Sequence, residues 1–273
     1  MLNTDAPVPL DFLINGTFLR TSLEDYLKDH GLSFESTVTL QYVRSLIPPT
    51  YQASFEHDDW VADVDVLSAT SRAGAWAGDA LPHGQDRVLS ASYDGLLRMW
   101  NQSGQVVAVS PSGSNGGHSA GVKAAKFLDA SQIASAGMDY TVRVWKYTEA
   151  AGQLSGEFKP TLELYGHKGV VEALDVHGPS GQILTASSTG EVGLWSASRA
   201  KAPAAPEAAL PGANPAKKRK LAGASAAPQR GPLFLTQVHQ APATAVLFHP
   251  QDATAAYTAS QDHTIRTLDL TTA

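Results

Sequence analysis

The segment ASYDGLLRMW (91–100) recurs without gaps as AGMDYTVRVW (136–145) and ASSTGEVGLW (186–195), and less closely as ASQDHTIRTL (259–268). The first three copies end in Trp at positions 100, 145 and 195, so their spacings are 45 and 50 residues. Repetition with a period of this size indicates an array of equivalent structural units, each too small to bury a core alone. The recurrence therefore decides the fold class before any single motif is considered.

Four columns of polar and aromatic residues run through these copies. A His precedes each of the last three copies, a Ser or Thr stands directly before every copy, the fourth residue is Asp except in the third copy, and the tenth is Trp except in the last. The columns are His118, His167 and His239; Ser90, Ser135, Thr185 and Thr258; Asp94, Asp139, Thr189 and Asp262; and Trp100, Trp145, Trp195 and Leu268. A single active site would not recur in every unit. The columns therefore favour a structural network over a Ser–His–Asp hydrolase site, and no catalytic residue is expected.

These columns resemble the WD-repeat family, in which His, Ser or Thr, Asp and Trp form a hydrogen-bond network inside each four-stranded blade of a β-propeller. The resemblance implies that the third network, with Thr189 in the Asp column, and the fourth, with Leu268 in the Trp column, are incomplete and weaker. Family members commonly have seven blades, whereas the repeats over 58–273 account for about four. We therefore expect an incomplete propeller, in a chain that is cut at both ends.

Two insertions interrupt the repeats. Residues 69–86 are rich in Ala and Gly and predict a mobile loop in the first blade. Residues 196–232 are rich in Ala and Pro with few large apolar residues, which predicts a disordered insertion before a fourth strand at 233–237. The second insertion contains four adjacent cations, Lys217, Lys218, Arg219 and Lys220. Such a group suits a nuclear-import receptor or a phosphate backbone, and a solvated charge run is the alternative.

The first 48 residues predict a smaller unit. Asn15-Gly16 between two apolar runs indicates a type I′ hairpin, because both central residues of that turn need φ > 0. Thr21 and Glu24 have capping-box spacing before a short helix that Gly31 can end. Alternation over 38–45 predicts a half-buried strand.

This order of elements, with Glu-Ser-Thr at 35–37, resembles the second half of ubiquitin. The fold class expected is therefore mainly β. It comprises a partial ubiquitin-like (β-grasp) domain over 1–48, a linker over 49–57 and the WD-repeat propeller over 58–273.

The composition narrows the possible functions. Of 273 residues, 43% are hydrophobic and 17% are charged, which is typical of a globular protein, and the net charge of −6 argues against binding nucleic acid over the whole surface. The absence of Cys excludes disulfides, thiolate zinc sites and Cys nucleophiles. No apolar run approaches the roughly 18 residues of a membrane span, and no nucleotide-binding or zinc-protease motif is present. No cofactor and no membrane partner are expected.

A ubiquitin-like module directly before WD repeats, together with a basic insertion after the third repeat, resembles the WD-repeat subunit of the PeBoW ribosome-assembly complex and, more distantly, Notchless. The resemblance implies a non-enzymatic assembly factor for the large (60S) ribosomal subunit, located in the nucleolus and nucleoplasm. The implied partners are a Block-of-proliferation-type WD protein, Pescadillo, the pre-60S particle and the AAA ATPase midasin. Midasin would hold the ubiquitin-like domain and release the complex from the pre-ribosome.

The same resemblance implies a role for Glu35 as a ligand, in trans, to the Mg²⁺ of midasin's adhesion site. A solvated turn carboxylate is the alternative, because ubiquitin carries Glu in its own Glu-Ser-Thr turn. For the whole protein, the alternative function is a WD-repeat substrate adaptor of a ubiquitin ligase. The absence of an F-box-like helical segment before the blades argues against that alternative.

Overall fold

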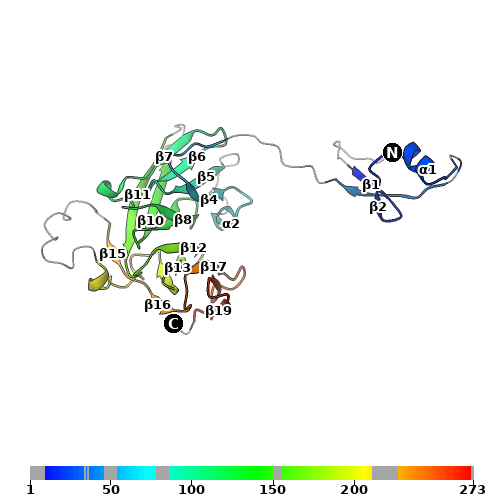
Figure 1. Ribbon diagram of the computed structural model, residues 1–273. Coiled ribbons are helices and arrows are strands. Elements are labelled where there is room, and N and C mark those ends of the chain that lie inside the picture. Colours follow the sequence, from blue (N-terminus) through cyan, green and yellow to red (C-terminus); the bar gives the residue numbers. More distant parts are fainter. Residues whose placement is uncertain are drawn as a thin grey trace. The chain divides into compact units, whose positions relative to one another are not determined.

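The computed structural model describes residues 10–33, 35, 37–45, 54–77, 86–149, 155–210 and 227–271. It divides into two compact units, Met1–Gln52 and Ala53–Ala273, which are considered separately below. Both units are built mainly of strands, which confirms the predicted fold class (Figure 1). Within the described residues, no helix is long and apolar enough to span a membrane.

The first unit is a three-stranded antiparallel sheet, of order β2-β1-β3, with one helix. Strands β1 (Leu10–Ile14) and β2 (Thr17–Phe18) are joined at Asn15 and Gly16, whose φ angles are 49° and 80°. These positive angles confirm the predicted hairpin turn. Strand β3 (Leu40–Arg44) pairs with the other edge of β1.

Helix α1 (Leu23–Asp29) differs from its prediction at its start. Ser22 is the N-cap, and its hydroxyl accepts the backbone N–H of Asp25 at 3.1 Å, so the predicted Thr21–Glu24 capping box is wrong by one residue. Ser22 and Asp25 have the same spacing, and the sequence pattern alone did not separate the two registers.

The prediction of a half-buried third strand is also wrong, because β3 is exposed along its whole length. Within the described part of this unit, the fully buried apolar side chains are Ile14 and Leu27. A single seven-residue helix covers too little of the sheet to bury Leu40 or Tyr42 as well.

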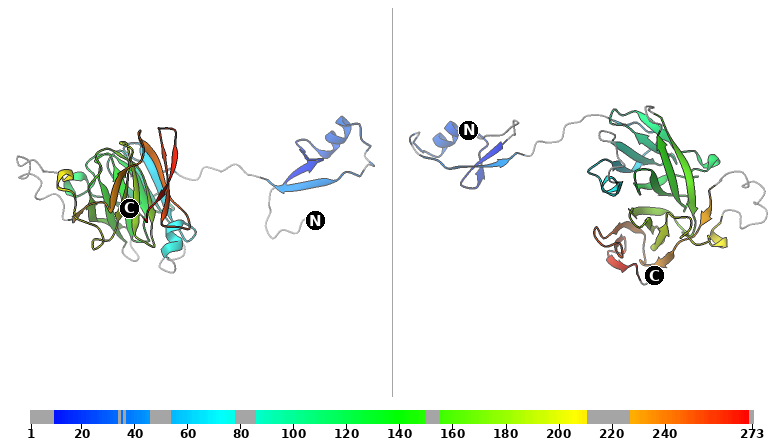
Figure 2. Two further views of the ribbon diagram at one scale, coloured as in Figure 1. Left: turned by 90° about the horizontal axis from the view of Figure 1, so that it is seen from below. Right: turned by 180° about the vertical axis from the view of Figure 1, so that it is seen from behind.

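The described residues of the second unit form four mainly antiparallel sheets, which follow one another around an arc (Figures 1 and 2). We call them the first to fourth blades. The first comprises β4 (Val61–Leu67), β5 (Arg87–Ser92), β6 (Leu97–Trp100) and β7 (Val106–Val109). The second comprises β8 (Val122–Phe127), β9 (Gln132–Gly137), β10 (Val142–Glu149) and β11 (Gly156–Leu164). The third comprises β12 (Val171–His177), β13 (Gln182–Ser187), β14 (Glu191–Ser196) and β16 (Phe234–Gln237). The fourth comprises β17 (Ala243–Phe248), β18 (Ala255–Ser260) and β19 (Ile265–Asp269).

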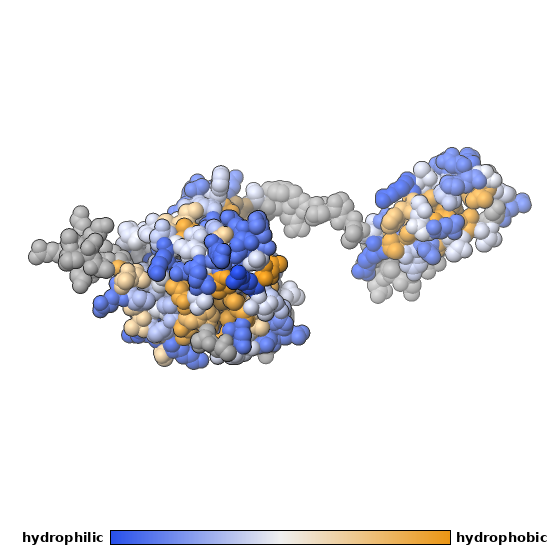
Figure 3. All heavy atoms as spheres, turned by 60° about the horizontal axis from the view of Figure 1, so that its bottom comes forward, coloured by the Kyte–Doolittle hydropathy of each residue, from blue (hydrophilic) through white to orange (hydrophobic). Residues whose placement is uncertain are grey.

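The core of this unit lies between adjacent blades. The first strands of consecutive blades contact one another, β4 with β8, β8 with β12 and β12 with β17. Three clusters of buried apolar side chains fill the successive junctions, and Trp145 and Trp195 are fully buried in the first two clusters. Apolar residues also reach the surface of the unit, where Figure 3 shows them gathered on part of one face.

The insertion over 196–232 is not disordered at its two ends, so that prediction is wrong for the part that the structure describes. Residues 198–210 and 227–232, here called the strap, contain a 3-10 turn (Glu207–Ala209) and strand β15 (Gln229–Arg230). Strand β15 pairs in parallel with β11, so a segment inserted in the third blade adds a fifth strand to the second (Figure 1). The pairing covers the edge of β11. The Ala- and Pro-rich sequence of the insertion gave no reason to expect such a strand.

Two further predictions need correction. The expected mobile loop over 69–86 contains helix α2 (Arg72–Ala77), which buries Ala73 and Gly74. The expected linker over 49–57 is part of the first blade from residue 54 onward, because Phe55 stacks on Trp100 with ring centroids 5.3 Å apart. In both cases contacts with distant residues, rather than local composition, hold the segment.

Candidate functional site

The second blade contains the most complete polar network. The Ser135 hydroxyl lies 2.7 Å from Nε2 of His118 and accepts the indole N–H of Trp145 at 2.7 Å. Nδ1 of His118 donates to the Asp139 carboxylate at 2.9 Å, and Asp139 also accepts the Thr141 hydroxyl. Because a carboxylate only accepts, Nδ1 of His118 carries the proton that it donates to Asp139. The side chains of His118, Ser135, Asp139 and Trp145 are therefore all hydrogen-bonded within this network.

The ionisation of Asp139 reflects these contacts. Burial opposes its charged form, but the charge and hydrogen bond of His118, with hydrogen bonds from Thr141 and the Ser119 backbone, together hold the pKa of Asp139 well below its usual range. A carboxylate with a lowered pKa and several hydrogen bonds is suited to fixing a turn rather than to transferring protons near neutral pH.

The first blade has the same contacts among His, Ser and Trp, with a His that the sequence columns missed. Nε2 of His57 lies 2.7 Å from the Ser90 hydroxyl, which also accepts the indole N–H of Trp100 at 2.8 Å. His57 precedes Ser90 by 33 residues, whereas the other blades have 17 to 19 residues between the paired positions. The insertion over 69–86 accounts for the difference. The sequence does contain a signal for His57. It stands shortly before the alternating strand at 61–67, as His118 stands shortly before the strand at 122–127.

The Asp column of the first blade has a different partner. The Asp94 carboxylate pairs with the guanidinium of Arg98 at 2.5 Å, and Arg98 also pairs with Asp58 at 2.7 Å. His57 instead directs Nδ1 to the backbone carbonyl of Phe55 at 3.2 Å. In the first network, therefore, an arginine binds the Asp and a backbone carbonyl binds the His, and the two are not bonded to each other in this structure.

The third network is incomplete, as predicted. His167 and Trp195 both contact the Thr185 hydroxyl at 2.7 Å, but Nδ1 of His167 is buried without a hydrogen-bond partner in the described structure. The nearest carboxylate, that of Glu191, is 3.9 Å away. Thr189 stands in the Asp position and donates its hydroxyl to Glu191. Burial without a partner lowers the pKa of His167 to about 4, so this ring is neutral at pH 7.

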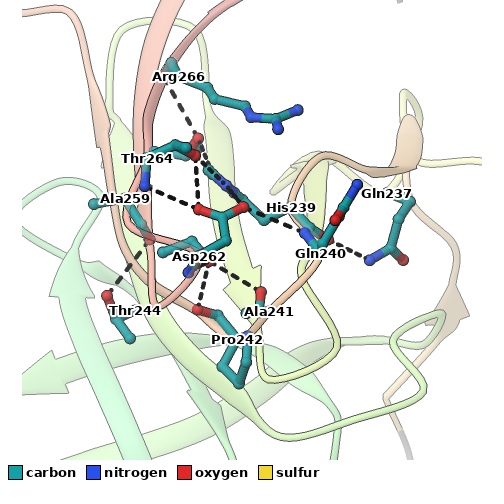
Figure 4. Close-up of polar contacts among 12 residues, drawn as sticks. Gln237, His239, Gln240, Ala241, Pro242, Thr244, Ala259, Asp262, Thr264 and Arg266 are labelled. Carbon is teal, nitrogen blue, oxygen red and sulfur yellow. Dashed lines mark hydrogen bonds and ion pairs between the residues drawn. The ribbon is translucent and has the colours of Figure 1, made fainter.

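The fourth network keeps its carboxylate. Nε2 of His239 lies 2.8 Å from the Thr258 hydroxyl and Nδ1 lies 2.9 Å from Asp262 (Figure 4). The Thr264 hydroxyl donates to Asp262 at 2.6 Å, and this bond is the largest cause that holds the pKa of Asp262 below its usual range. The Leu268 side chain has no donor to replace the indole N–H of Trp, so the fourth network is incomplete, as predicted.

Neighbouring blades are joined by carboxylates that sequence reasoning did not single out. Asp65 on β4 accepts the backbone N–H of Phe127 on β8, and Asp175 on β12 accepts that of Phe248 on β17, each at 2.8 Å. Burial raises the pKa of Asp65 from its ordinary value. The available signal was an Asp inside the apolar alternation of a first strand, at the same position in two blades.

The remaining candidate residues lie outside these networks. Glu35 is exposed, its backbone N–H is 3.2 Å from the Ser33 hydroxyl, and it forms no ion pair within the described residues. The basic group Lys217, Lys218, Arg219 and Lys220 lies outside the described residues. The part of the chain that the structure describes contains no group of three or more His, Asp or Glu able to hold a metal ion.

Comparison with known proteins agrees with this architecture. The NLE (NUC135) domain family matches residues 1–27, and the WD domain, G-beta repeat family matches residues 106–146 and 158–196. Each WD match begins at or within the outermost antiparallel strand of one blade and ends in the third strand of the next, so the sequence repeat is out of phase with the blade.

Ribosome biogenesis protein YTM1 of Chaetomium globosum is 64% identical over 272 residues, covering 100% of this chain and 56% of that protein. The chain is therefore similar over its whole length to a YTM1 protein. The YTM1 proteins of Neurospora crassa and Podospora anserina are 62% and 60% identical over 275 and 277 residues, again covering all of this chain. The chain spans about half the length of these YTM1 proteins, 56% and 57% of the two.

Proposed function

We propose that the chain acts in ribosome biogenesis as a non-enzymatic assembly factor. The observation that carries the proposal is 64% identity over the whole chain to a protein named for ribosome biogenesis. The polar networks support a non-enzymatic role, because their His, Ser, Thr and Asp side chains are occupied by hydrogen bonds within each blade. A propeller of such blades presents large rigid surfaces for binding other macromolecules.

The finer proposal is a scaffold for the large (60S) subunit and for pre-rRNA maturation, as a subunit of the PeBoW complex. In this proposal a Block-of-proliferation-type WD protein binds the propeller, and Pescadillo belongs to the same complex. The support is the whole-chain resemblance, in which an NLE-type unit precedes WD repeats.

Affinity purification of the tagged chain, followed by sedimentation in a sucrose gradient, tests this proposal. Co-sedimentation with pre-60S particles is expected, and co-purification with cullins instead would favour the ubiquitin-ligase adaptor. Arg199→Ala with Lys201→Ala, two exposed residues of the strap, provides a folded control that should remain bound. Sedimentation free of both assemblies would contradict the proposal.

For the ubiquitin-like unit, we propose that Glu35 completes the coordination of Mg²⁺ in midasin's adhesion site. Magnesium prefers oxygen ligands in octahedral geometry at about 2.0–2.1 Å, so a protruding carboxylate suits it. The exposure of Glu35 supports this role, as does its backbone bond to Ser33, which fixes the turn.

Binding to the isolated adhesion domain in Mg²⁺ and in EDTA tests the assignment. Glu35→Ala is expected to abolish Mg²⁺-dependent binding and Glu35→Asp to weaken it, because the shorter side chain withdraws the oxygens. Glu24→Ala is a matched control, since Glu24 is also exposed but already pairs with Lys28 at 2.7 Å. Unchanged binding of Glu35→Ala would contradict the assignment.

For the basic group at 217–220, we propose a role in nuclear import. Changing all four residues to Ala should leave a fluorescent fusion of the chain in the cytoplasm, whereas the Arg199→Ala, Lys201→Ala control should still enter the nucleus. Nuclear accumulation of the quadruple variant in cells that lack its binding partners would contradict an import role.

A further inference from the structure

Helix α2 belongs to the first blade by sequence and contacts the third blade in space. It lies between β4 and β5 in the chain and projects beyond the strands at one face of the propeller unit (Figure 2). Its residues Ala73 and Gly74 are buried, which fixes it against its own blade. Its two large side chains, Arg72 and Trp76, contact residues of the third blade.

Arg72 ends at a carboxylate that already joins two other blades. Its guanidinium pairs with both oxygens of Asp175 on β12, and the Asp175 side chain is only 5% exposed. The same carboxylate accepts the backbone N–H of Phe248 on β17 at 2.8 Å. A buried carboxylate is stabilised by a paired cation and by hydrogen-bond donors, and Asp175 receives these from the first and the fourth blade together.

Trp76 makes the apolar part of the same contact. Its ring meets the imidazole of His177 edge-on, with centroids 5.9 Å apart, and lies so close to Gly178 that a Cβ there would overlap it. The Arg72 guanidinium lies over the Trp76 ring, 5.2 Å from its centroid. Trp76 packs against both the cluster between the first and second blades and the cluster between the second and third.

We propose that α2 is a clasp, formed by Arg72 and Trp76, that couples the first blade to the junction of the third and fourth blades. In a repeat array whose units contact only their neighbours, local opening of one unit need not affect a unit two places away. The clasp adds a direct contact between such units. Its release should therefore loosen β12 and β17, although α2 lies in neither blade.

Amide hydrogen exchange on the complete 273-residue chain tests the clasp. Trp76→Ala and Arg72→Gln are each expected to accelerate exchange at least fivefold in peptides from β12 and β17. Trp76→Phe, which keeps a ring over Gly178, should restore most of the protection. Val107→Ala is the matched control, because it truncates a buried side chain of the first blade on the outer strand β7.

Two results would overturn the proposal. One is acceleration by Trp76→Ala and Arg72→Gln that stays within α2, β4 and β5. The other is acceleration of β17 by Val107→Ala as large as that by Trp76→Ala, which would show general destabilisation. If Trp76→Ala does not fold, Arg72→Gln combined with Asp175→Asn decides. If the clasp acts through Asp175, the double variant should exchange in β17 no faster than Asp175→Asn alone. An acceleration equal to the product of the two single-variant effects would reject the proposal.

Discussion

Nδ1 of His167 lies 3.9 Å from the carboxylate of Glu191, whereas the same nitrogen of His118 and of His239 is 2.9 Å from an Asp. The difference arises because Thr189 stands where the second and fourth blades have Asp. A buried polar nitrogen without a partner costs free energy, so the third blade is held less strongly than its sequence repeat suggests.

Thr189→Asp is expected to stabilise the protein. The new carboxylate can accept the N–H of His167 as Asp139 accepts that of His118, and a charge-assisted bond of this kind should add roughly 1–2 kcal/mol to the free energy of unfolding. Urea denaturation measures the change. Thr189→Asn, with a neutral acceptor, should give a smaller gain. Equal or lower stability for Thr189→Asp would show that His167 is already satisfied in solution.

The buried His167 should also make stability fall in mildly acidic solution. Its pKa is about 4 in the folded chain, against about 6.5 when unfolded, so between these values the unfolded state binds more protons. The free energy of unfolding is therefore unaffected by this group above about pH 6.5 and decreases as the pH falls toward 4, by an amount on the order of 3 kcal/mol. Urea titrations across this range should show the loss in wild type and a smaller loss in His167→Gln. Identical pH dependences of stability in wild type and His167→Gln would contradict this role of His167.

The stability difference caused by Asp139→Ala should depend on pH in a lower range than the effect of His167. Removing the carboxylate leaves His118 and Thr141 without their acceptor, at a cost of about 1–3 kcal/mol near neutrality. Because the pKa of Asp139 is depressed in the folded chain, its stabilisation is present above the unfolded value near 4 and is lost as the pH falls through the folded one. The gap in unfolding free energy between wild type and variant should therefore narrow below about pH 4. A gap independent of pH would argue against an ionised Asp139.

Trp145→Ala should be more damaging than any polar substitution. The side chain is fully buried, and removing a buried Trp costs about 3–5 kcal/mol through lost packing. Trp145→Phe removes the bond to Ser135 and a smaller part of the buried ring system, so it should cost less than Trp145→Ala. Thermal unfolding measures both. If Trp145→Ala kept its melting temperature and lost one binding partner, this column would be a binding surface instead.

His57→Ala tests the network that the structure adds to the first blade. His57 contacts the Ser90 hydroxyl and lies against Trp100, so its removal should lower the free energy of unfolding by about 1–3 kcal/mol. His30→Ala is the control, because His30 is exposed in the other unit. Differential scanning calorimetry should show a lower transition for His57→Ala alone. Equal transitions would make 54–57 a linker after all.

Repetition made the blades predictable, because each column was visible in several copies at once. The residues around Ser135 could be located in the sequence since His118, Asp139 and Trp145 recur at matched distances. His57 escaped because the insertion that contains α2 nearly doubles its separation from Ser90.

The two misjudged insertions show what composition cannot reveal. Helix α2 is short and Ala- and Gly-rich, and its conformation depends on Arg72 and Trp76 meeting residues of the third blade. Strand β15 has two residues and forms because the edge of β11 offers it a partner. In both segments the stabilising contact lies far away in the sequence, so no local pattern encodes it.

The strap has a consequence for how this chain can change over evolution. Leu210 and Ala227 bound the undescribed part of the insertion, and on either side of it the chain is held by the bridge of Ala204 to Arg230 and by β15 on β11. Because both anchors are backbone pairings, they do not depend on the side chains of the residues that join them. The sequence between the anchors is therefore open to selection for length and charge, while the blades stay constrained.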